Sequence, residues 1–175
     1  MTSCVETLTS ILNFIIIVYT KRLILTVALE IKPVVGLCAL PFGATMKEAE
    51  KTFGKPEETE LLDDIEEYQS TVWHYWDHGF SLFFDESDKQ LFCCVEIDNR
   101  EVTLWGKHIF DMDEKQIIEL FKGRGITEHE SEVHEWGEKR LSFDQANIDF
   151  YFEKNKLSSI NYGKSVVDLP LIFPN

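Results

Sequence analysis

Two pairs of histidines are the residues whose type and spacing could hold a metal ion. His74 and His78 stand four residues apart in the segment HYWDHG. On a strand that spacing separates them by about 13 Å, too far to share one metal, and the aromatic residues around them favour a strand. His129 and His134 lie among glutamates, where we expect a solvated surface, with a metal site as the alternative. We therefore predict no metal site.

The sequence offers little else for catalysis. The segment DMDEKQ (111–116) begins like a calcium-binding loop, but Gln116 stands where the loop needs glycine and Lys122 where it needs a final glutamate. The chain contains no G-x-S-x-G, no H-E-x-x-H and no glycine-rich phosphate loop. We therefore expect a protein that is not an enzyme and needs no cofactor; a small enzyme is the least favoured alternative.

Four cysteines, Cys4, Cys38, Cys93 and Cys94, bear on the redox compartment. None forms a C-x-x-C pair, which argues against a zinc cage. Cys93 and Cys94 are adjacent in a segment typical of a strand, so their side chains should point to opposite faces. We expect free thiols in a reducing compartment, which favours a cytoplasmic location.

Charge and composition limit the kinds of partner. The chain of 175 residues carries a net charge of −14, and 44% of its residues are hydrophobic. It is therefore long and apolar enough to bury a core. The negative charge repels phosphate backbones, which argues against a nucleic-acid partner and favours a cationic protein.

Two apolar runs, at 11–19 and 23–29, precede the rest of the chain, and Lys21 and Arg22 separate them. Neither run reaches the roughly 20 apolar residues that a membrane-spanning helix needs. The first seven residues hold Glu6 and no cation, unlike the start of a secretory signal. We expect two strands or one helix packed on the domain. The alternative is a membrane anchor or a signal, which would make the protein envelope-associated.

A short helix is predicted to begin after Thr45, because Thr45 and Glu48 have the spacing of a capping box. Gly54, followed closely by a proline, ends it. Its apolar stripe consists of Met46, Ala49 and Phe53. A helix of about ten residues is marginal alone, so it must lie on an apolar surface.

A second helix of the same design is predicted about 66 residues downstream. Asp111 takes the cap position, Glu114 the capping-box position, and Gly123 ends the helix. Its apolar residues are Ile117, Ile118, Leu120 and Phe121.

The segments after the two helices also match each other. An acidic linker (57–67 or 128–138) comes first, and aromatic segments typical of strands come next, with turns at 77–79 and 145–147. We predict an α+β fold in which two tandem α-β-β-β repeats form one mainly antiparallel sheet, with both helices on one face. The predicted organisation is an apolar N-terminal segment (1–32), repeat 1 (33–100), repeat 2 (101–164) and a C-terminal tail (165–175).

Two features of these repeats predict a surface for another protein. Acids in the linkers would steer a basic partner, with two solvated loops as the alternative. Strand alternation places Phe83 and Tyr151 on the sheet face opposite the helices, and we expect Trp73 and Tyr75 to join them. The alternative is that the N-terminal segment or a second subunit covers this face. The acids of the first linker are Glu57, Glu58, Glu60, Asp63, Asp64, Glu66 and Glu67.

The residues around the first helix also resemble a known pattern. They form the motif G-x-T-x-x-E…F-G-K-P at Gly43, Thr45, Glu48, Phe53, Gly54, Lys55 and Pro56. Followed by aromatic strands, this motif resembles the helix–loop–β unit of the β-lactamase-inhibitor-protein fold, and the small outer-membrane lipoproteins of the SmpA/OmlA type use a similar unit. The resemblance covers residues 33–163, although the second copy has Lys-Gly-Arg-Gly at 122–125 where G-x-P would stand. It implies a non-catalytic protein-binding scaffold that uses the open face of its sheet.

Together these patterns predict a non-catalytic protein-binding module, an inhibitor or immunity-type protein that masks a basic partner. The alternative is an envelope-associated structural or assembly module anchored by the N-terminal segment. The sequence leaves the oligomeric state open.

Overall fold

The computed structural model describes residues 29–62, 70–85 and 89–164. The predictions for the apolar runs before residue 29, for the acids at 63–67 and for the C-terminal tail lie outside these residues. The described helices are α2 (Met46–Phe53) and α3 (Glu114–Lys122), with short 3-10 helices η1 (Trp76–His78), η2 (Ile109–Asp111) and η3 (Asp144–Ala146). The strands are β1 (Glu30–Lys32), β2 (Gly36–Leu37), β3 (Leu40–Pro41), β4 (Glu58–Leu62), β5 (Ser70–Tyr75), β6 (Phe80–Asp85), β7 (Phe92–Ile97), β8 (Thr103–Leu104), β9 (Lys107–His108), β10 (Glu130–Val133), β11 (Lys139–Phe143), β12 (Ile148–Glu153) and β13 (Lys156–Gly163).

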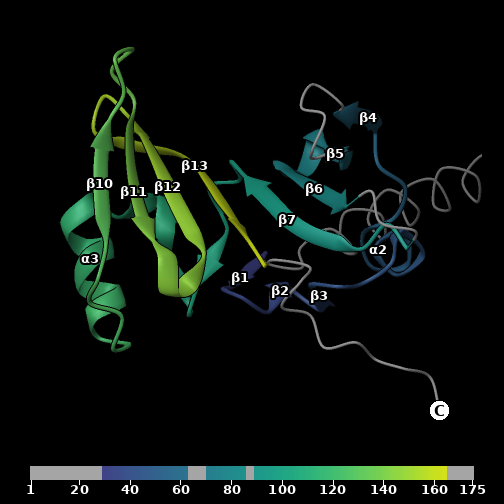
Figure 1. Cartoon of the computed structure of the whole chain (residues 1–175), viewed down its shortest axis with the longest axis horizontal. Coiled ribbons are helices and arrows are strands. Elements are labelled where there is room, and N and C mark those ends of the chain that lie inside the picture. The colour runs from purple at the N-terminus through teal and green to yellow at the C-terminus, as the bar shows by residue number, and fades with distance from the viewer. Residues whose placement is uncertain (1–28, 63–69, 86–88, 165–175) are drawn as a thin grey trace, which may run out of the picture.

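These strands form two sheets. The large sheet has the order β10-β11-β12-β13-β7-β6-β5-β4, and all its neighbours are antiparallel. The small sheet has the order β3-β2-β1-β8-β9, with a parallel pair between β1 and β8. Its strands β1–β3 lie below the middle of the large sheet in Figure 1, where β13 and β7 meet. The prediction of an α+β, mainly antiparallel fold is confirmed, but the small sheet was not foreseen.

Both helices pack on one face of the large sheet. Phe53 of α2 lies with its ring centroid 5.0 Å from that of Phe80, and Phe121 of α3 stacks on Phe143 at 3.9 Å and meets Phe150 edge-on at 5.7 Å. The register carries Phe80 and Phe150 onto the same face through the strands between them. The residues of β6 and β12 that alternate with Phe83 and Tyr151 are buried there: Phe80, Leu82, Phe84, Ile148, Phe150 and Phe152.

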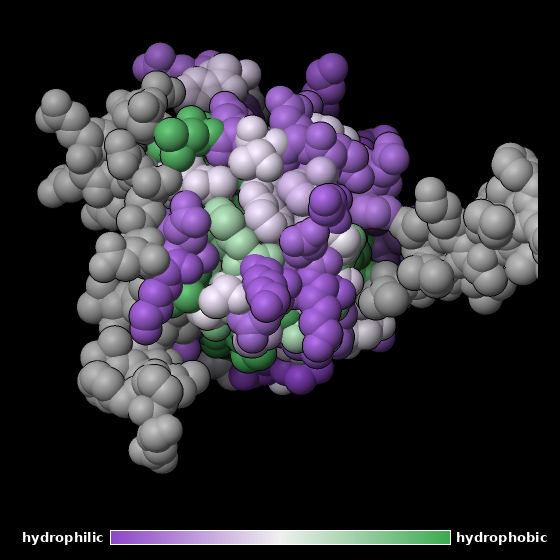
Figure 2. All heavy atoms as spheres, turned by 90° about the vertical axis from the view of Figure 1, so that its right-hand side faces the viewer, coloured by the Kyte–Doolittle hydropathy of each residue, from purple (hydrophilic) through white to green (hydrophobic). Residues whose placement is uncertain are grey.

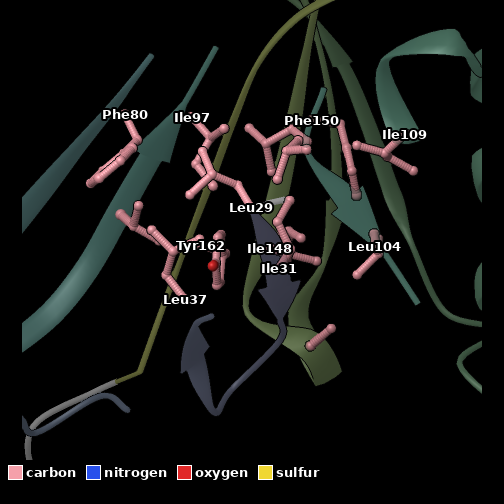
Figure 3. Packing of buried hydrophobic residues seen from close by; sticks show 14 of the residues in the cluster. Leu29, Ile31, Leu37, Phe80, Ile97, Leu104, Ile109, Ile148, Phe150 and Tyr162 are labelled. Carbon is pink, nitrogen blue, oxygen red and sulfur yellow. The ribbon is translucent and has the colours of Figure 1, made fainter. Parts of the chain in front are cut away.

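The core extends from this face into the small sheet. Leu29, Ile31 and Leu37 are buried together with residues of β12 and β13 (Figure 3). The phenol of Tyr162 on β13 reaches across and donates a hydrogen bond of 3.1 Å to the carbonyl of Gly36 on β2. The two sheets therefore share one core.

The first helix begins as predicted, with a reciprocal capping box between Thr45 and Glu48. The prediction for the second helix was wrong by two residues. Its N-cap is Asp113, which forms the box with Gln116, because Asp111 is the last residue of η2.

The acidic linkers prove to be partly strand. They contain β4 and β10, which pair with β5 and β11 and form the two edges of the large sheet. Each helix is therefore followed by four strands rather than three. The predicted turns are present as η1 and η3, which end in the left-handed residues Gly79 and Asn147. No helix among the described residues is long and apolar enough to cross a membrane.

Candidate functional site

The face of the large sheet opposite the helices, here called the outer face, carries a continuous line of polar side chains. Cross-strand pairing places one residue from each of the eight strands in register across the whole sheet. We call this line the polar row, and from β4 to β10 it consists of Glu58, His74, Ser81, Glu96, Asn161, Asp149, Ser142 and Glu130. Since neighbouring strands lie about 4.8 Å apart, the row extends over roughly 34 Å.

One end of the polar row is held by the imidazole of His74. Its Nε2 lies 3.2 Å from Oε2 of Glu60, and its Nδ1 lies 2.9 Å from the Ser81 hydroxyl oxygen. A carboxylate only accepts hydrogen bonds, so in the neutral imidazole Nε2–H donates to Glu60 and Nδ1 accepts from Ser81. Both ring nitrogens are therefore occupied, and the ring is fixed.

Glu60, His74 and Ser81 have the residue types of a hydrolase triad, which requires a check for the rest of that machinery. A serine nucleophile needs backbone N–H donors aimed at a developing oxyanion. Ser81 stands inside the sheet, and its strand pairs with β5 on one side and β7 on the other, so the local backbone N–H groups are engaged in the ladder. Only 8% of the surface of Ser81 is exposed. The strand itself offers no oxyanion hole, and the chain of hydrogen bonds satisfies a buried imidazole.

The centre of the polar row holds two acids, Glu96 on β7 and Asp149 on β12. Burial, with a contribution from Asp98, raises the pKa of Glu96, while His74 opposes the shift. Across β13, Asp149 accepts a hydrogen bond of 3.1 Å from Nε of Arg140, and this carboxylate raises the pKa of the guanidinium.

Carboxylates outnumber cations on the part of the outer face that the structure describes. The register places acids on it along every described strand of the large sheet except β5, β11 and β13, and the cations that it places there are Arg140 and Lys156. The side of the molecule bearing β4 and α2 is mostly hydrophilic over its described surface, with small apolar patches (Figure 2). The acids of the outer face are Glu58, Glu60, Asp85, Glu96, Glu130, Glu132, Asp149 and Glu153.

The other end of the polar row is a shallow hollow beside the edge strand β10. Its lining includes Glu130, Glu132, Arg140 and Ser142. The Ser142 hydroxyl donates to Asp144 at 3.3 Å. This end thus carries Arg140 and Asp144, whereas the β4 end carries the imidazole of His74 and the indole of Trp76.

The structure puts two of the four predicted aromatics on the outer face. Phe83 and Tyr151 are half-buried and lie on opposite sides of the polar row, next to Ser81 and Asp149 along their strands. From the register they are roughly 20 Å apart, so they do not form one cluster. Burial raises the pKa of Tyr151, with Asp149 adding to the shift and Arg140 opposing it.

The placement predicted for Trp73 and Tyr75 was wrong. The connection through η1 pairs Tyr75 with Phe80, which sets both residues on the helix side of the sheet. Tyr75 is fully buried and donates a hydrogen bond of 2.9 Å to the Gly54 carbonyl, and Trp73 packs on Phe84. Neither side chain is part of the outer face.

The structure describes only some of the predicted acids. Glu58 and Glu60 are exposed on the outer face of β4, and Glu57 precedes the strand and donates its backbone N–H to the carbonyl of His74. The other predicted acids, Asp63, Asp64, Glu66 and Glu67, lie outside the described residues. In the part of the chain that the structure describes, no group of three or more histidine, cysteine or acidic side chains could hold a metal ion.

Sequence reasoning missed the polar row itself. The signal was partly present, since His74, Ser81 and Glu96 each stand between two apolar residues. The row becomes visible only when the register across four or more strands is known, and the acidic edge strands resemble loops in sequence. The exposed Trp76 was also missed, because its position beside the row depends on the same register.

Comparisons with known proteins identify no family. No protein-family model and no curated protein matches the chain. Three solved structures are similar over part of it. An extracellular protein containing an SCP domain from Bacillus anthracis str. Ames has 12% sequence identity, covers 70% of this chain and 44% of its own, and gives a TM-score of 0.43.

The other two are equally distant. A DUF4309 family protein from Bacillus subtilis subsp. subtilis str. 168 has 12% identity over 69% of this chain and 78% of its own, with a TM-score of 0.41. A cysteine-rich secretory protein from Staphylococcus aureus subsp. aureus Mu50 has 15% identity over 70% of this chain and 43% of its own, with a TM-score of 0.38. In two of the three cases the chain spans less than half of the neighbour's length. These likenesses carry no functional argument.

Proposed function

We propose that this protein is a non-catalytic binding module that masks a basic protein, as an inhibitor or immunity protein does, and that the outer face is its binding surface. The observation that carries this proposal is the polar row, because it lines up carboxylates across the whole sheet with few cations beside them. A surface of one sign attracts a partner of the other sign and raises its association rate.

The same proposal includes a duplicated architecture. Both halves have the order hairpin, helix, edge strand, strand, 3-10 turn, strand, strand. The hairpin residues Cys38 and Trp105 both have φ near +53°, being +54° and +52°, and β-bulges follow both Phe83 and Tyr151. We infer two tandem units joined between β7 and β13. This arrangement is compatible with the resemblance to the β-lactamase-inhibitor-protein fold, which stays a prediction.

The row and the aromatics would have different tasks. Exposed acids at the edge strands, such as Glu58 and Glu130, would speed encounter and lose their effect as salt rises. Half-buried Phe83 and Tyr151 would supply affinity, at about 2 kcal/mol or more each if they are hot spots. Since they lie on opposite sides of the polar row, the partner must cover most of the outer face to reach both.

Two alternatives make different predictions. A small enzyme would lose turnover when Ser81 or His74 is replaced by alanine, and the engaged backbone around Ser81 speaks against it. An envelope-associated assembly module would place the chain in the membrane fraction, whereas we propose a cytoplasmic location. Cell fractionation followed by detection of the chain separates these two locations.

The decisive experiment measures binding kinetics with a partner captured from the native host. The double variant Phe83→Ala/Tyr151→Ala should weaken binding by about a thousandfold if both are hot spots of about 2 kcal/mol. The matched control is Leu61→Ala/Val133→Ala, which removes exposed apolar side chains from the helix side of the two edge strands. The control should bind like the natural protein. Equal effects of both double variants, with both proteins folded, would contradict the proposed surface.

A further inference from the structure

Trp76 is an exposed tryptophan at the β4 end of the polar row. It is the first residue of η1, directly after β5, and 57% of its surface is exposed. An exposed indole is commonly mobile, but this one is held on two sides. Its ring stacks on the imidazole of His74, with centroids 4.2 Å apart and planes within 8° of parallel. Its Nε1–H donates to Oε2 of Glu58 at 3.1 Å.

One of the two groups that hold the indole is itself fixed. His74 has both ring nitrogens engaged, by Glu60 and by Ser81. Glu58 and Glu60 extend from the same face of β4, about 7 Å apart. In the resulting corner, one indole face lies on a fixed imidazole, an acid meets the indole edge, and a second acid stands close by.

This corner has the chemistry that recognises a guanidinium. A planar cation stacks on an indole, which is the best aromatic partner for it, and its N–H groups bind carboxylates in a fork. We propose that Trp76, Glu58 and Glu60 form a binding site for an arginine side chain. This inference rests on the proposed function, since it names the side chain of the basic partner that enters the outer face.

The opposite end of the row provides an internal comparison. The residue that occupies the place of Trp76 after β11 is Asp144, and Arg140 already lies beside the acids of that end. Trp136 provides a second comparison. It is 74% exposed and stacks on His134 at 4.6 Å, but it belongs to the turn between β10 and β11. The Nε1–H of Trp136 donates to Oε2 of Glu138, in its own turn, at 3.4 Å. Neither place combines an open indole with two acids of one strand on the outer face.

The test uses NMR of the tryptophan indole N–H groups in the full chain. The probe is a blocked peptide, Gly-Arg-Gly-Arg-Gly, and its two controls carry lysine or the neutral isostere citrulline. The variants Trp76→Phe and Trp136→Phe identify the two exposed indole signals. We expect the Trp76 signal to shift saturably with the arginine peptide, about fivefold more weakly with lysine, and not at all with citrulline.

Two acid variants locate the charge. Glu58→Gln should weaken arginine-peptide binding about tenfold, whereas Glu130→Gln, at the other end of the row, should leave it unchanged. Equal shifts of the Trp136 signal, equal affinity for lysine, or binding of citrulline would each overturn the site. Because the probe is a peptide, this outcome is independent of the Phe83 and Tyr151 experiment, and either proposal can fail alone.

Discussion

The hydrogen bond from Tyr162 to Gly36 is a sharp test of how the two sheets are joined. Both residues are buried, and the bond links β13 of the large sheet to β2 of the small one. Replacing Tyr162 with phenylalanine keeps the ring and removes only the hydroxyl. A buried acceptor that loses its donor costs about 1–3 kcal/mol. We therefore expect Tyr162→Phe to lower the free energy of unfolding by about 2 kcal/mol, or the melting temperature by about 4–8 °C.

Tyr75→Phe is the matched control. Tyr75 is equally buried and also donates to a glycine carbonyl, but its acceptor, Gly54, is exposed, so water can replace the lost hydroxyl. The expected cost is at the low end of the usual range, about 0.5 kcal/mol. Urea denaturation followed by circular dichroism measures both values. Equal costs for the two variants would refute the reasoning, because the two sites differ in the burial of the acceptor.

The pH dependence gives the same prediction a second readout. Burial raises the pKa of Tyr162 well above the ordinary value of 10.0. The unfolded phenol can therefore ionise above pH 10 while the folded one stays protonated, so the folded protein loses stability as pH rises from there. The loss is about 1.4 kcal/mol per pH unit from this group. Tyr162→Phe lacks that loss, so its deficit of about 2 kcal/mol at pH 8 should shrink to less than about 1 kcal/mol at pH 11. A deficit that stays constant would mean that the phenol is reached by water.

Three further predictions concern other parts of the fold. Gly36→Ala should cost about 3 kcal/mol or more in urea unfolding, because φ is +152° and a Cβ would clash with the β2–β3 hairpin, whereas Gly106→Ala, with open space around it, should cost about 1 kcal/mol. Asp113→Ala should lower stability by about 1 kcal/mol through loss of the α3 cap, and Asp111→Ala should change it little; the reverse order would contradict the cap assignment. Burial raises the pKa of the Cys94 thiol to about 12, so iodoacetamide at pH 8 should modify it far more slowly in the folded protein than in urea; equal rates would contradict its burial.

The helix-side half of the fold could be predicted because local rules determine it. The Thr45–Glu48 box and the alternation of Phe80, Leu82 and Phe84 each depend on residues within one element. The start of α3 was misplaced because Asp111 and Asp113 can both serve as its N-cap. The choice depends on η2, which contains Asp111 and which no local sequence pattern predicts. Gln116, three residues after Asp113, was the available signal.

The outer face could not be predicted because it depends on register between strands. The side of the sheet on which Tyr75 lies follows from the connection through η1. This connection pairs Tyr75 with Phe80, so the two share a face, and Phe83 lies on the other one. Counting the four residues from Trp76 to Gly79 would have given this pairing. Predicting the contact between Glu60 and His74 would also have required β4 to be recognised as a strand. The acids in β4 argue against a strand, because glutamate has a low strand propensity.

The two faces of the sheet also differ in how the proposed duplication has been preserved. On the helix side, equivalent positions keep similar side chains, such as Tyr75 with Phe143, and both are fully buried. Along the polar row, positions at the same place in the two proposed units differ, since His74 corresponds to Ser142. Packing against a helix limits what a buried position can accept, whereas an outer-face position is limited only by its neighbours and by what binds there. Because the two ends of the row differ chemically, a partner that recognises the His74–Trp76 end would bind the sheet in only one of the two orientations that a symmetric row would allow.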